Sequence, residues 1–487
     1  MSSFTRLAAA IMALAAACPL AAHAELGVTP PDAPAAPSAP VPSPGQPGWA
    51  SNLFAPSQTT LLGDMWGLRP ALDRAGLSLG LQVVGELSAN PTGGYRRGAT
   101  YKGLALLSMG LDTAKAGWWE GGIFNVSALQ IHGRDITVDN IGVLNVLSST
   151  EASRSTRLWE AWFQQSFLGG KIDVKVGQQA VDLEFMTSNY AAMFVNASFG
   201  YPLVPSLGQY GGGPAYPLAA LGVRLRAQPT PDWTMLLGVF DDNAPGGPFY
   251  DDSQIRGASQ SGTKFHTGTG ALVMTEVQYG LNTPGKGPDG KPVNRGLPGT
   301  YKLGAWYDTG RFPDQRYDTA GLSLADPASS GIARQRRNNW GLYAGADQMI
   351  WRPHPDSPQV VGAFIRAFGA PGDRNLSSFS ANAGITLKAP FHGRDDDIVG
   401  IGYGYGRIGA RAIALDRDRA AVAGAYPIRS SESYVELTYL AQVAPWWTVQ
   451  PNFQYFWLPG GGVPDPLNPA RRIANPSVYT LKTTLTF

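Results

Sequence analysis

One stretch of the chain, residues 179–219, gathers side chains that can recognise hydroxyl groups. These are two carboxylates, one amide and two aromatic rings: Asp182, Glu184, Asn196, Phe185 and Tyr190. Carboxylates and amides hydrogen-bond to hydroxyls, and an aromatic ring packs against the apolar C–H face of a sugar. The stretch therefore has the chemistry of a sugar-binding loop. The alternative is a loop that packs its rings against a neighbouring wall and binds nothing.

The elements that hold this stretch are predicted by alternation of apolar and polar residues. In the final segment, residues 477–487, one side of the strand is apolar or aromatic at most positions and the other is polar at most positions. A strand with one apolar and one polar face that ends on an aromatic residue is typical of an outer-membrane β-barrel, with lipid outside and a polar lumen inside.

Sixteen segments alternate in this way from residue 77 onward. Their approximate bounds are 77–88, 101–112, 120–131, 156–167, 171–178, 220–227, 232–240, 271–281, 300–308, 339–351, 358–368, 379–389, 396–407, 431–443, 446–457 and 477–487. Short turns alternate with long loops between them, as in bacterial barrels, whose strand number is even. The sequence therefore predicts an all-β fold, a sixteen-stranded antiparallel transmembrane barrel. One connection, 282–299, is long on the short-turn side, so it is either an insertion or a sign of a shifted register.

The lumen-facing positions follow from the need for apolar residues against lipid. Leu77, Leu79, Leu81, Val83 and Leu87 point outward in the first strand, so Glu86 points inward, and the same argument turns Arg224, Arg226 and Arg366 inward. With the loop they give the predicted constriction, namely Glu86, Asp182, Glu184, Phe185, Tyr190, Asn196, Arg224, Arg226 and Arg366. The alternative for each residue is that it only solvates a wide lumen. Tryptophans near strand ends resemble the aromatic belts of membrane proteins; they are Trp118, Trp119, Trp233, Trp351, Trp446, Trp447 and Trp457.

The N-terminal region has a different composition. Residues 1–24 contain Arg6, an apolar Ala-rich run and a final Ala-His-Ala, which predicts a cleaved secretory signal. Residues 25–60 are rich in proline and predict an extended periplasmic arm. A short helix at about 64–76 precedes the first strand, and residues 61–487 form the barrel. The single cysteine, Cys18, lies inside the signal, so the exported chain has no thiol for a disulfide or metal site.

Composition excludes several classes of protein. The net charge of +2 and 15% charged residues provide no basic field for nucleic acid. After the signal, no apolar run approaches the roughly 20 residues of a membrane helix. The four histidines outside the signal (His132, His266, His354 and His392) show no spacing typical of a catalytic base or metal ligand. We therefore expect no enzyme, cofactor or metal; the acidic run 395–397 could hold calcium but is better read as a turn.

Three groups of residues resemble the carbohydrate-selective porin family, the OprB type. They are Gly63-Asp64 with Gly67, Arg69, Leu72, Gly76, Glu86, Asn90, Gly93 and Gly94; Gly177 with Asp182, Glu184, Phe185, Tyr190, Phe194, Asn196 and Gly200-Tyr201-Pro202; and Pro445 to Tyr455 with Pro459-Gly460-Gly461. The resemblance covers about residues 61–487. Two positions depart from the family pattern: Met186 follows Glu-Phe, where an acidic residue is usual, and Met65 follows Gly-Asp, where tryptophan is usual.

This resemblance implies an outer-membrane porin of a Gram-negative bacterium, through which glucose and related monosaccharides or polyols diffuse passively. The expected partners are the transported sugars and outer-membrane lipid. The barrel is expected to be a monomer or a homotrimer, and the Pro-rich arm is expected to make contacts in the periplasm. Met186 leaves the sugar preference open. The alternatives are a general or anion-selective porin, whose lumen should be rich in Lys and Arg, and an outer-membrane enzyme or structural barrel.

Overall fold

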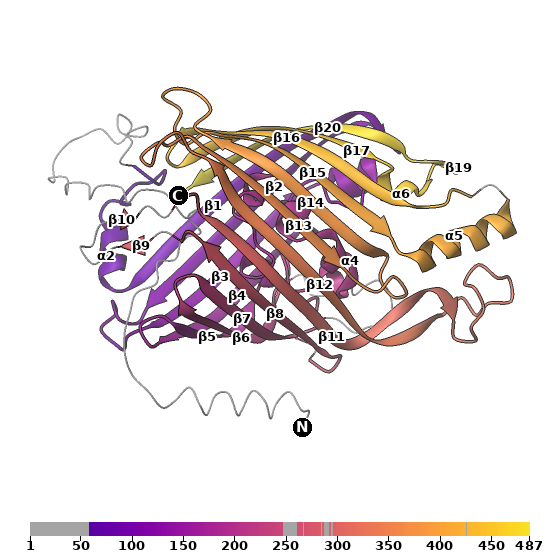
Figure 1. The fold of residues 1–487 in the computed structure, drawn as a ribbon, viewed down its shortest axis with the longest axis horizontal. Coiled ribbons are helices and arrows are strands. Elements are labelled where there is room, and N and C mark those ends of the chain that lie inside the picture. Colours follow the sequence, from indigo (N-terminus) through magenta and orange to yellow (C-terminus); the bar gives the residue numbers. More distant parts are fainter. Residues whose placement is uncertain are drawn as a thin grey trace.

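The computed structural model describes residues 58–246, 261–265, 267–283, 285–286, 292–293, 296–424 and 426–487. Sixteen antiparallel strands pair in chain order into a closed barrel (Figure 1). They are β1 Leu77–Gly94, β2 Gly98–Asp112, β3 Gly122–Gly133, β4 Ser155–Phe167, β5 Ile172–Gln179, β6 Ala220–Thr230, β7 Trp233–Asp241, β8 Ala271–Leu281, β11 Gly299–Asp318, β12 Ala333–Trp351, β13 Val360–Gly369, β14 Ser377–Lys388, β15 Ile398–Ile408, β16 Ser431–Ala444, β17 Trp447–Trp457 and β20 Ala474–Thr486. The predicted barrel is confirmed, and each predicted segment overlaps one of these strands.

The first and last strands close the barrel. β1 pairs antiparallel with β20, and the backbone N–H of Phe487 donates to the carbonyl of Leu81 at 2.8 Å. Glu86 and Lys482 are direct partners in this ladder, and their charged groups lie 3.2 Å apart. A closed sheet has no edge strand, so the spanning backbone needs no hydrogen-bond partner from lipid.

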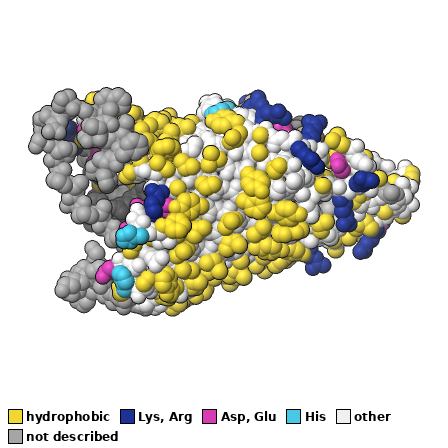
Figure 2. All heavy atoms as spheres, turned by 90° about the horizontal axis from the view of Figure 1, so that it is seen from above, with side chains coloured by type: hydrophobic (Ala, Val, Ile, Leu, Met, Phe, Trp, Pro, Cys, Tyr) yellow, Lys and Arg dark blue, Asp and Glu magenta, His cyan; other side chains and the backbone are white. Residues whose placement is uncertain are grey.

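The two faces of the strands follow the predicted alternation. On β13, Ile365 is 60% exposed whereas the next residue, Arg366, is 3% exposed; on β16, Leu437 is 51% exposed and Glu436 is fully buried. Figure 2 shows the outward side chains as a broad apolar band across the face of the barrel in view. That band fits a lipid environment, and the polar residues between its members point into the barrel.

The connection 282–299 is an insertion, and the barrel register is not shifted. It contains a small hairpin of β9 Gly285–Lys286 and β10 Pro292–Val293, while β8 pairs directly with β11. The hairpin lies at the same end of the barrel as α2 Leu68–Arg74, the short-turn end, and α5 Ala410–Ala423 lies at the opposite, long-loop end (Figure 1). The long-loop end also carries α6 Pro459–Gly462 and a two-stranded sheet of β18 Pro464–Asp465 and β19 Asn468–Arg472.

The predicted helix before the barrel is present as α2 Leu68–Arg74, shorter than expected. Gly76 follows it with φ 77°, a left-handed conformation that glycine adopts without strain and that ends helices. The predicted signal and nearly all of the predicted Pro-rich arm lie outside the described residues. None of the described helices is both long and apolar enough to cross a membrane.

Most of the tryptophans expected at the membrane interface lie on the outer surface. Trp118, Trp119, Trp233, Trp351 and Trp457 are each at least 40% exposed. Trp446 is different: it is 6% exposed and stacks on Trp447, with ring centroids 6.0 Å apart. Trp446 is therefore packed and is not part of an exposed belt, because its ring is covered where β16 turns into β17.

Candidate functional site

The connection between β5 and β6, residues 180–219, folds into the barrel and is called the constriction loop below. Its short helices are η2 Val181–Leu183, η3 Ala191–Met193, α3 Ala197–Gly200, α4 Leu203–Gly208 and η4 Tyr210–Gly212. The N–H of Met186 donates to Glu276 of β8 at 2.7 Å, and the N–H of Val195 donates to Glu436 of β16 at 2.6 Å. Because these strands lie far apart around the wall, the loop crosses the lumen.

A second loop, residues 134–154 between β3 and β4, also folds inward and braces the first. It contains η1 Thr137–Ile141. The N–H of Ser149 donates to the Val195 carbonyl at 2.9 Å, and the N–H of Ala197 donates to the Val146 carbonyl at 3.0 Å. The sequence interpretation did not assign this bracing loop. The sequence feature that could have indicated this loop is an excess of inward carboxylates on the wall. One of them, Glu432, accepts a hydrogen bond from the N–H of Leu144.

Three predicted constriction residues are buried anchors of these loops. Glu86 accepts hydrogen bonds of 2.8 and 2.6 Å from hydroxyls of the bracing loop. Asn196 donates to Gln454 of β17 at 3.0 Å, and Arg366 donates to the Phe199 carbonyl at 2.6 Å. All three are at most 3% exposed. Loops that leave water need partners for their polar groups, and these side chains supply them, so the expectation of direct solute contact is corrected for each.

The two aromatic candidates of the constriction loop have different positions. Phe185 is 1% exposed and packs edge to face on Phe240, with ring centroids 6.2 Å apart, inside an apolar cluster with Met274. Phe185 cannot stack on a solute, which corrects that expectation. Tyr190 is half-buried and lies over Gly362 of β13, where a Cβ would be 2.0 Å from its ring. The glycine makes room for the tyrosine, which remains the aromatic candidate.

Glu184, Arg224 and Arg226 come together as predicted, in a charged cluster with Asp173 and Lys175. The ladder between β5 and β6 sets Asp173 opposite Arg226 and Lys175 opposite Arg224. Arg224 Nε lies 2.5 Å from Glu184 Oε2, and Arg226 Nε lies 2.6 Å from Asp173 Oδ2. Lys175 also pairs with Glu184, and Arg224 with Asp173. The cluster thus ties the constriction loop to the wall with charges of both signs.

The outer members of the cluster face the lumen. The side chains of Arg226, Glu184 and Lys175 are 33%, 21% and 10% exposed, whereas those of Arg224 and Asp173 are 4% and 1% exposed. Burial alone would raise the pKa of the Glu184 carboxyl, but Lys175 and Arg224 outweigh it and hold the pKa below its usual range. Glu184 is therefore a carboxylate, and the cluster presents to the lumen one accessible anion and the accessible guanidinium of Arg226, which pairs with Asp173.

Asp182 has no comparable cation near it. The N–H of Tyr216 donates to its Oδ2 at 3.1 Å, and its Oδ1 is buried without a hydrogen-bond partner in the described part of the chain. Burial raises the pKa of Asp182 to about 7. Glu151 of the bracing loop is similar: burial raises its pKa to about 8, while the N–H of Ile136 donates to it at 3.0 Å. Both residues are half-buried, and their carboxyls accept hydrogen bonds from loop backbone.

Asp173 and Lys175 complete the charged cluster, although neither is among the predicted constriction residues. Lys175 Nζ also lies 4.4 Å from the ring centroid of Trp162 on β4, a cation–π contact. The alternating charges of β5 beside the two arginines of β6 were a usable signal, since paired strands set such residues opposite one another. Across the described residues, no group of three or more His, Cys, Asp or Glu side chains could hold a metal ion.

Comparisons with known proteins agree with this architecture. Residues 96–487 match the carbohydrate-selective porin, OprB family. The chain belongs to this family of porins. It is 26% identical to Porin B of Pseudomonas aeruginosa over 437 residues, covering 86% of this chain and 90% of that protein. It is 24% identical to the putative porin QuiX of Acinetobacter baylyi, covering 85% and 91%.

Solved structures show the same fold. The high-pH structure of Pseudomonas putida OprB superposes with a TM-score of 0.75 at 24% identity, covering 89% of this chain and 99% of that one. The low-pH structure of the same protein gives a TM-score of 0.53 at 18% identity, covering 89% and 100%. The protein is thus a carbohydrate-selective outer-membrane porin of the OprB family and belongs to no enzyme family.

Proposed function

We propose that this porin admits neutral monosaccharides and related polyols, glucose among them, to the periplasm by passive diffusion. The observation that supports this is the charged cluster, whose most exposed side chains are Arg226 and Glu184, at 33% and 21% exposed. One group accepts hydrogen bonds and the other donates them, so together they match sugar hydroxyls, which do both. Tyr190 is the proposed stacking surface.

Passage of a sugar through the pore requires weak contacts between the sugar and the constriction. A sugar sheds part of its water at the constriction and exchanges it for hydrogen bonds to the cluster, and a site that bound it tightly would not release it. The loops keep their positions because wall side chains hold their backbone polar groups. We therefore propose a rigid constriction that discriminates by hydrogen-bond geometry.

We also propose the N-terminal organisation predicted from the sequence. A cleaved signal at residues 1–24 would deliver the chain to the outer membrane, and residues 25–60 would form a periplasmic arm. Mass spectrometry of the purified mature chain tests the cleavage: a mass that begins at Glu25 is expected, and a retained leader would contradict the proposal.

Preference for anions is the second candidate, and one observation favours it. The cluster holds three cations and two carboxylates, so it carries one net positive charge. If this charge dominates, the pore selects sugar acids or phosphate over neutral sugars.

Single-channel conductance in a planar bilayer, titrated with glucose and separately with phosphate, tests the two candidates. Block that increases with glucose concentration, with little effect of phosphate, is expected. Block by phosphate alone would replace the proposal with an anion porin. Absence of any channel activity in correctly folded protein would contradict both.

A further inference from the structure

The long-loop end of the barrel has many exposed cations and few exposed carboxylates. Figure 2 shows Lys and Arg side chains gathered toward one end of the apolar band. Among the described residues the exposed cations at this end are Arg96, Arg97, Arg134, Arg154, Lys264, Arg311, Arg334, Arg337, Arg407, Arg417, Arg471 and Arg472, and the one exposed carboxylate is Asp326. This excess of exposed positive charge favours the binding of an anionic partner.

Three of these arginines lie on the outer face of the wall itself. Arg311 of β11 and Arg337 of β12 are direct partners in the ladder. Toward the long-loop end of the barrel, these arginines lie beyond Tyr307 and Trp340. The two aromatic residues are also direct partners and are 42% and 46% exposed on the lipid side. With about 3.3 Å per residue, Arg337 lies about 10 Å beyond the aromatic pair. The two guanidinium groups thus stand just outside the aromatic belt.

Arg407 of β15 repeats the arrangement. It is paired with Phe379 of β14 and follows Tyr405, and these two rings are in contact, with centroids 6.5 Å apart. We call Arg311, Arg337 and Arg407 the outer arginine triad. All three are exposed, and in the part of the chain that the structure describes their guanidinium groups have no ion-pair or hydrogen-bond partner.

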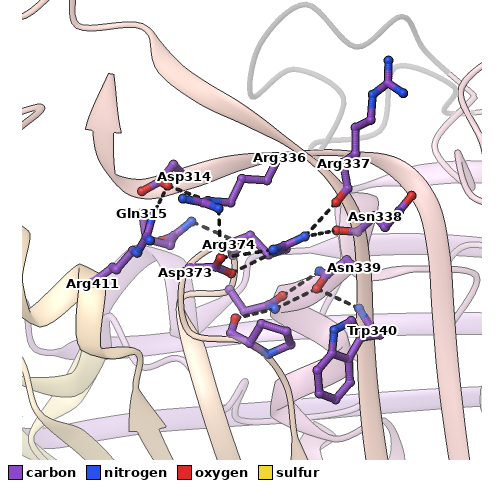
Figure 3. Close-up of polar contacts among 12 residues, drawn as sticks. Asp314, Gln315, Arg336, Arg337, Asn338, Asn339, Trp340, Asp373, Arg374 and Arg411 are labelled. Atoms are coloured by element: carbon purple, nitrogen blue, oxygen red, sulfur yellow. Dashed lines mark hydrogen bonds and ion pairs between the residues drawn. The ribbon is translucent and has the colours of Figure 1, made fainter. Parts of the chain in front are cut away.

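The arginines of the inward network at the same level each pair with a carboxylate. Arg336 lies 2.6 Å from Asp314 and 3.2 Å from Asp373, and Arg411 of α5 also pairs with Asp314. Figure 3 shows this network, with the side chain of Arg337 pointing away from it. Arg374 donates to the Arg337 carbonyl at 2.7 Å, so the backbone that presents this outward arginine is held in place.

Like charges set directly opposite in an antiparallel ladder are destabilising unless something neutralises them. Arg311 and Arg337 are such a pair, at the height of lipid headgroups. Guanidinium groups bind phosphate through two parallel hydrogen bonds. We propose that the outer arginine triad binds the phosphate groups of outer-leaflet lipopolysaccharide, whose lipid A headgroup carries phosphate next to acyl chains that would lie along the aromatic belt.

Native mass spectrometry of the detergent-solubilised porin with bisphosphorylated lipid A, and with the same lipid A after phosphatase treatment, tests the proposal. The triple variant Arg311→Gln/Arg337→Gln/Arg407→Gln is compared with Arg334→Gln/Arg417→Gln/Arg471→Gln, which removes three other exposed arginines, on β12, α5 and β19. Channel conductance in each variant reports folding. We expect the triad variant to bind bisphosphorylated lipid A at least about tenfold more weakly than wild type, and the control variant to bind about as well.

Two results would overturn the proposal: an unchanged affinity in the folded triad variant, or equal binding of phosphorylated and dephosphorylated lipid by the wild type. A third measurement adds inorganic phosphate to the complex of wild-type porin and lipid A. If phosphate displaces the lipid at millimolar concentration, the triad is a site for free anions and the lipid assignment is wrong.

Discussion

At the scale of single residues, the proposed sugar contact depends on Glu184 being charged and held. Lys175 and Arg224 hold its pKa low, and the same two cations restrain its side chain. The residue therefore acts as a hydrogen-bond acceptor in a fixed direction and also balances the cations of the wall.

Replacing Glu184 by Gln tests both roles. A hydrogen bond to a charged group is stronger than one to a neutral amide, so glucose block should weaken by about tenfold. The unbalanced cations should also raise selectivity for anions, measured as the reversal potential in a KCl gradient. Asp395→Asn, an exposed turn carboxylate, is the matched control. Unchanged block and unchanged reversal potential would remove Glu184 from the constriction.

The buried carboxyl of Asp182 predicts a dependence of stability on pH. Its pKa rises from 3.8 to about 7 on folding because of burial, so its contribution to stability is fully present below about pH 4 and is lost as pH rises through 7. The contribution of Glu151 to stability has the same pH dependence and is lost as pH rises through about 8.

The double variant Asp182→Asn/Glu151→Gln should therefore show a smaller fall in thermal unfolding midpoint between pH 5 and pH 9 than the wild type. Scans of both proteins in one detergent measure it. Equal slopes would mean that these carboxyls are ionised in the folded protein.

At the scale of elements, the constriction depends on wall side chains that hold loop backbone. Glu436 of β16 accepts from the N–H of Val195 and the N–H of Asn196, at 2.6 and 3.0 Å, and from the Asn452 amide. These bonds fix the middle of the constriction loop against the wall opposite the charged cluster.

Glu436→Ala should loosen that loop, because each buried N–H left unpaired costs about 1–3 kcal/mol. Single-channel conductance should rise and its discrimination between sugars should fall. Leu437→Ala, on the lipid face of the same strand, is the control and should leave both unchanged. A Glu436→Ala channel with wild-type conductance would show that the other anchors suffice.

At the scale of the whole molecule, the apolar band of the barrel needs an apolar environment such as lipid. Leu437 lies midway along β16 and is 51% exposed on that band. Leu437→Arg should lower the free energy of unfolding by about 2–4 kcal/mol, the range for a cation near the bilayer midplane.

Denaturant unfolding in lipid vesicles measures this loss. Val422→Arg on α5, also exposed but at the long-loop end, should cost far less. A similar cost for both substitutions would contradict the assignment of the band to lipid.

The ion pair between Glu184 and Arg224 was decided by the infolded loop. The sequence by itself determined the sixteen strands and the two faces of the wall. These follow from local rules, because alternation with period two reports which side meets lipid and strand neighbours are close in sequence. The insertion at 282–299 was open in the sequence, and the direct pairing of β8 with β11 resolved it.

Only the tertiary structure decided which inward groups meet solute. Glu86, Asn196 and Arg366 have the residue types of a sugar site, yet each takes part in a contact between a loop and the wall: Glu86 with Thr150 of the bracing loop, Asn196 with Gln454 of β17 and Arg366 with the Phe199 carbonyl. Phe185 faces an apolar cluster for the same reason. The position of an infolded loop depends on contacts between residues distant in sequence, and no local pattern encodes them.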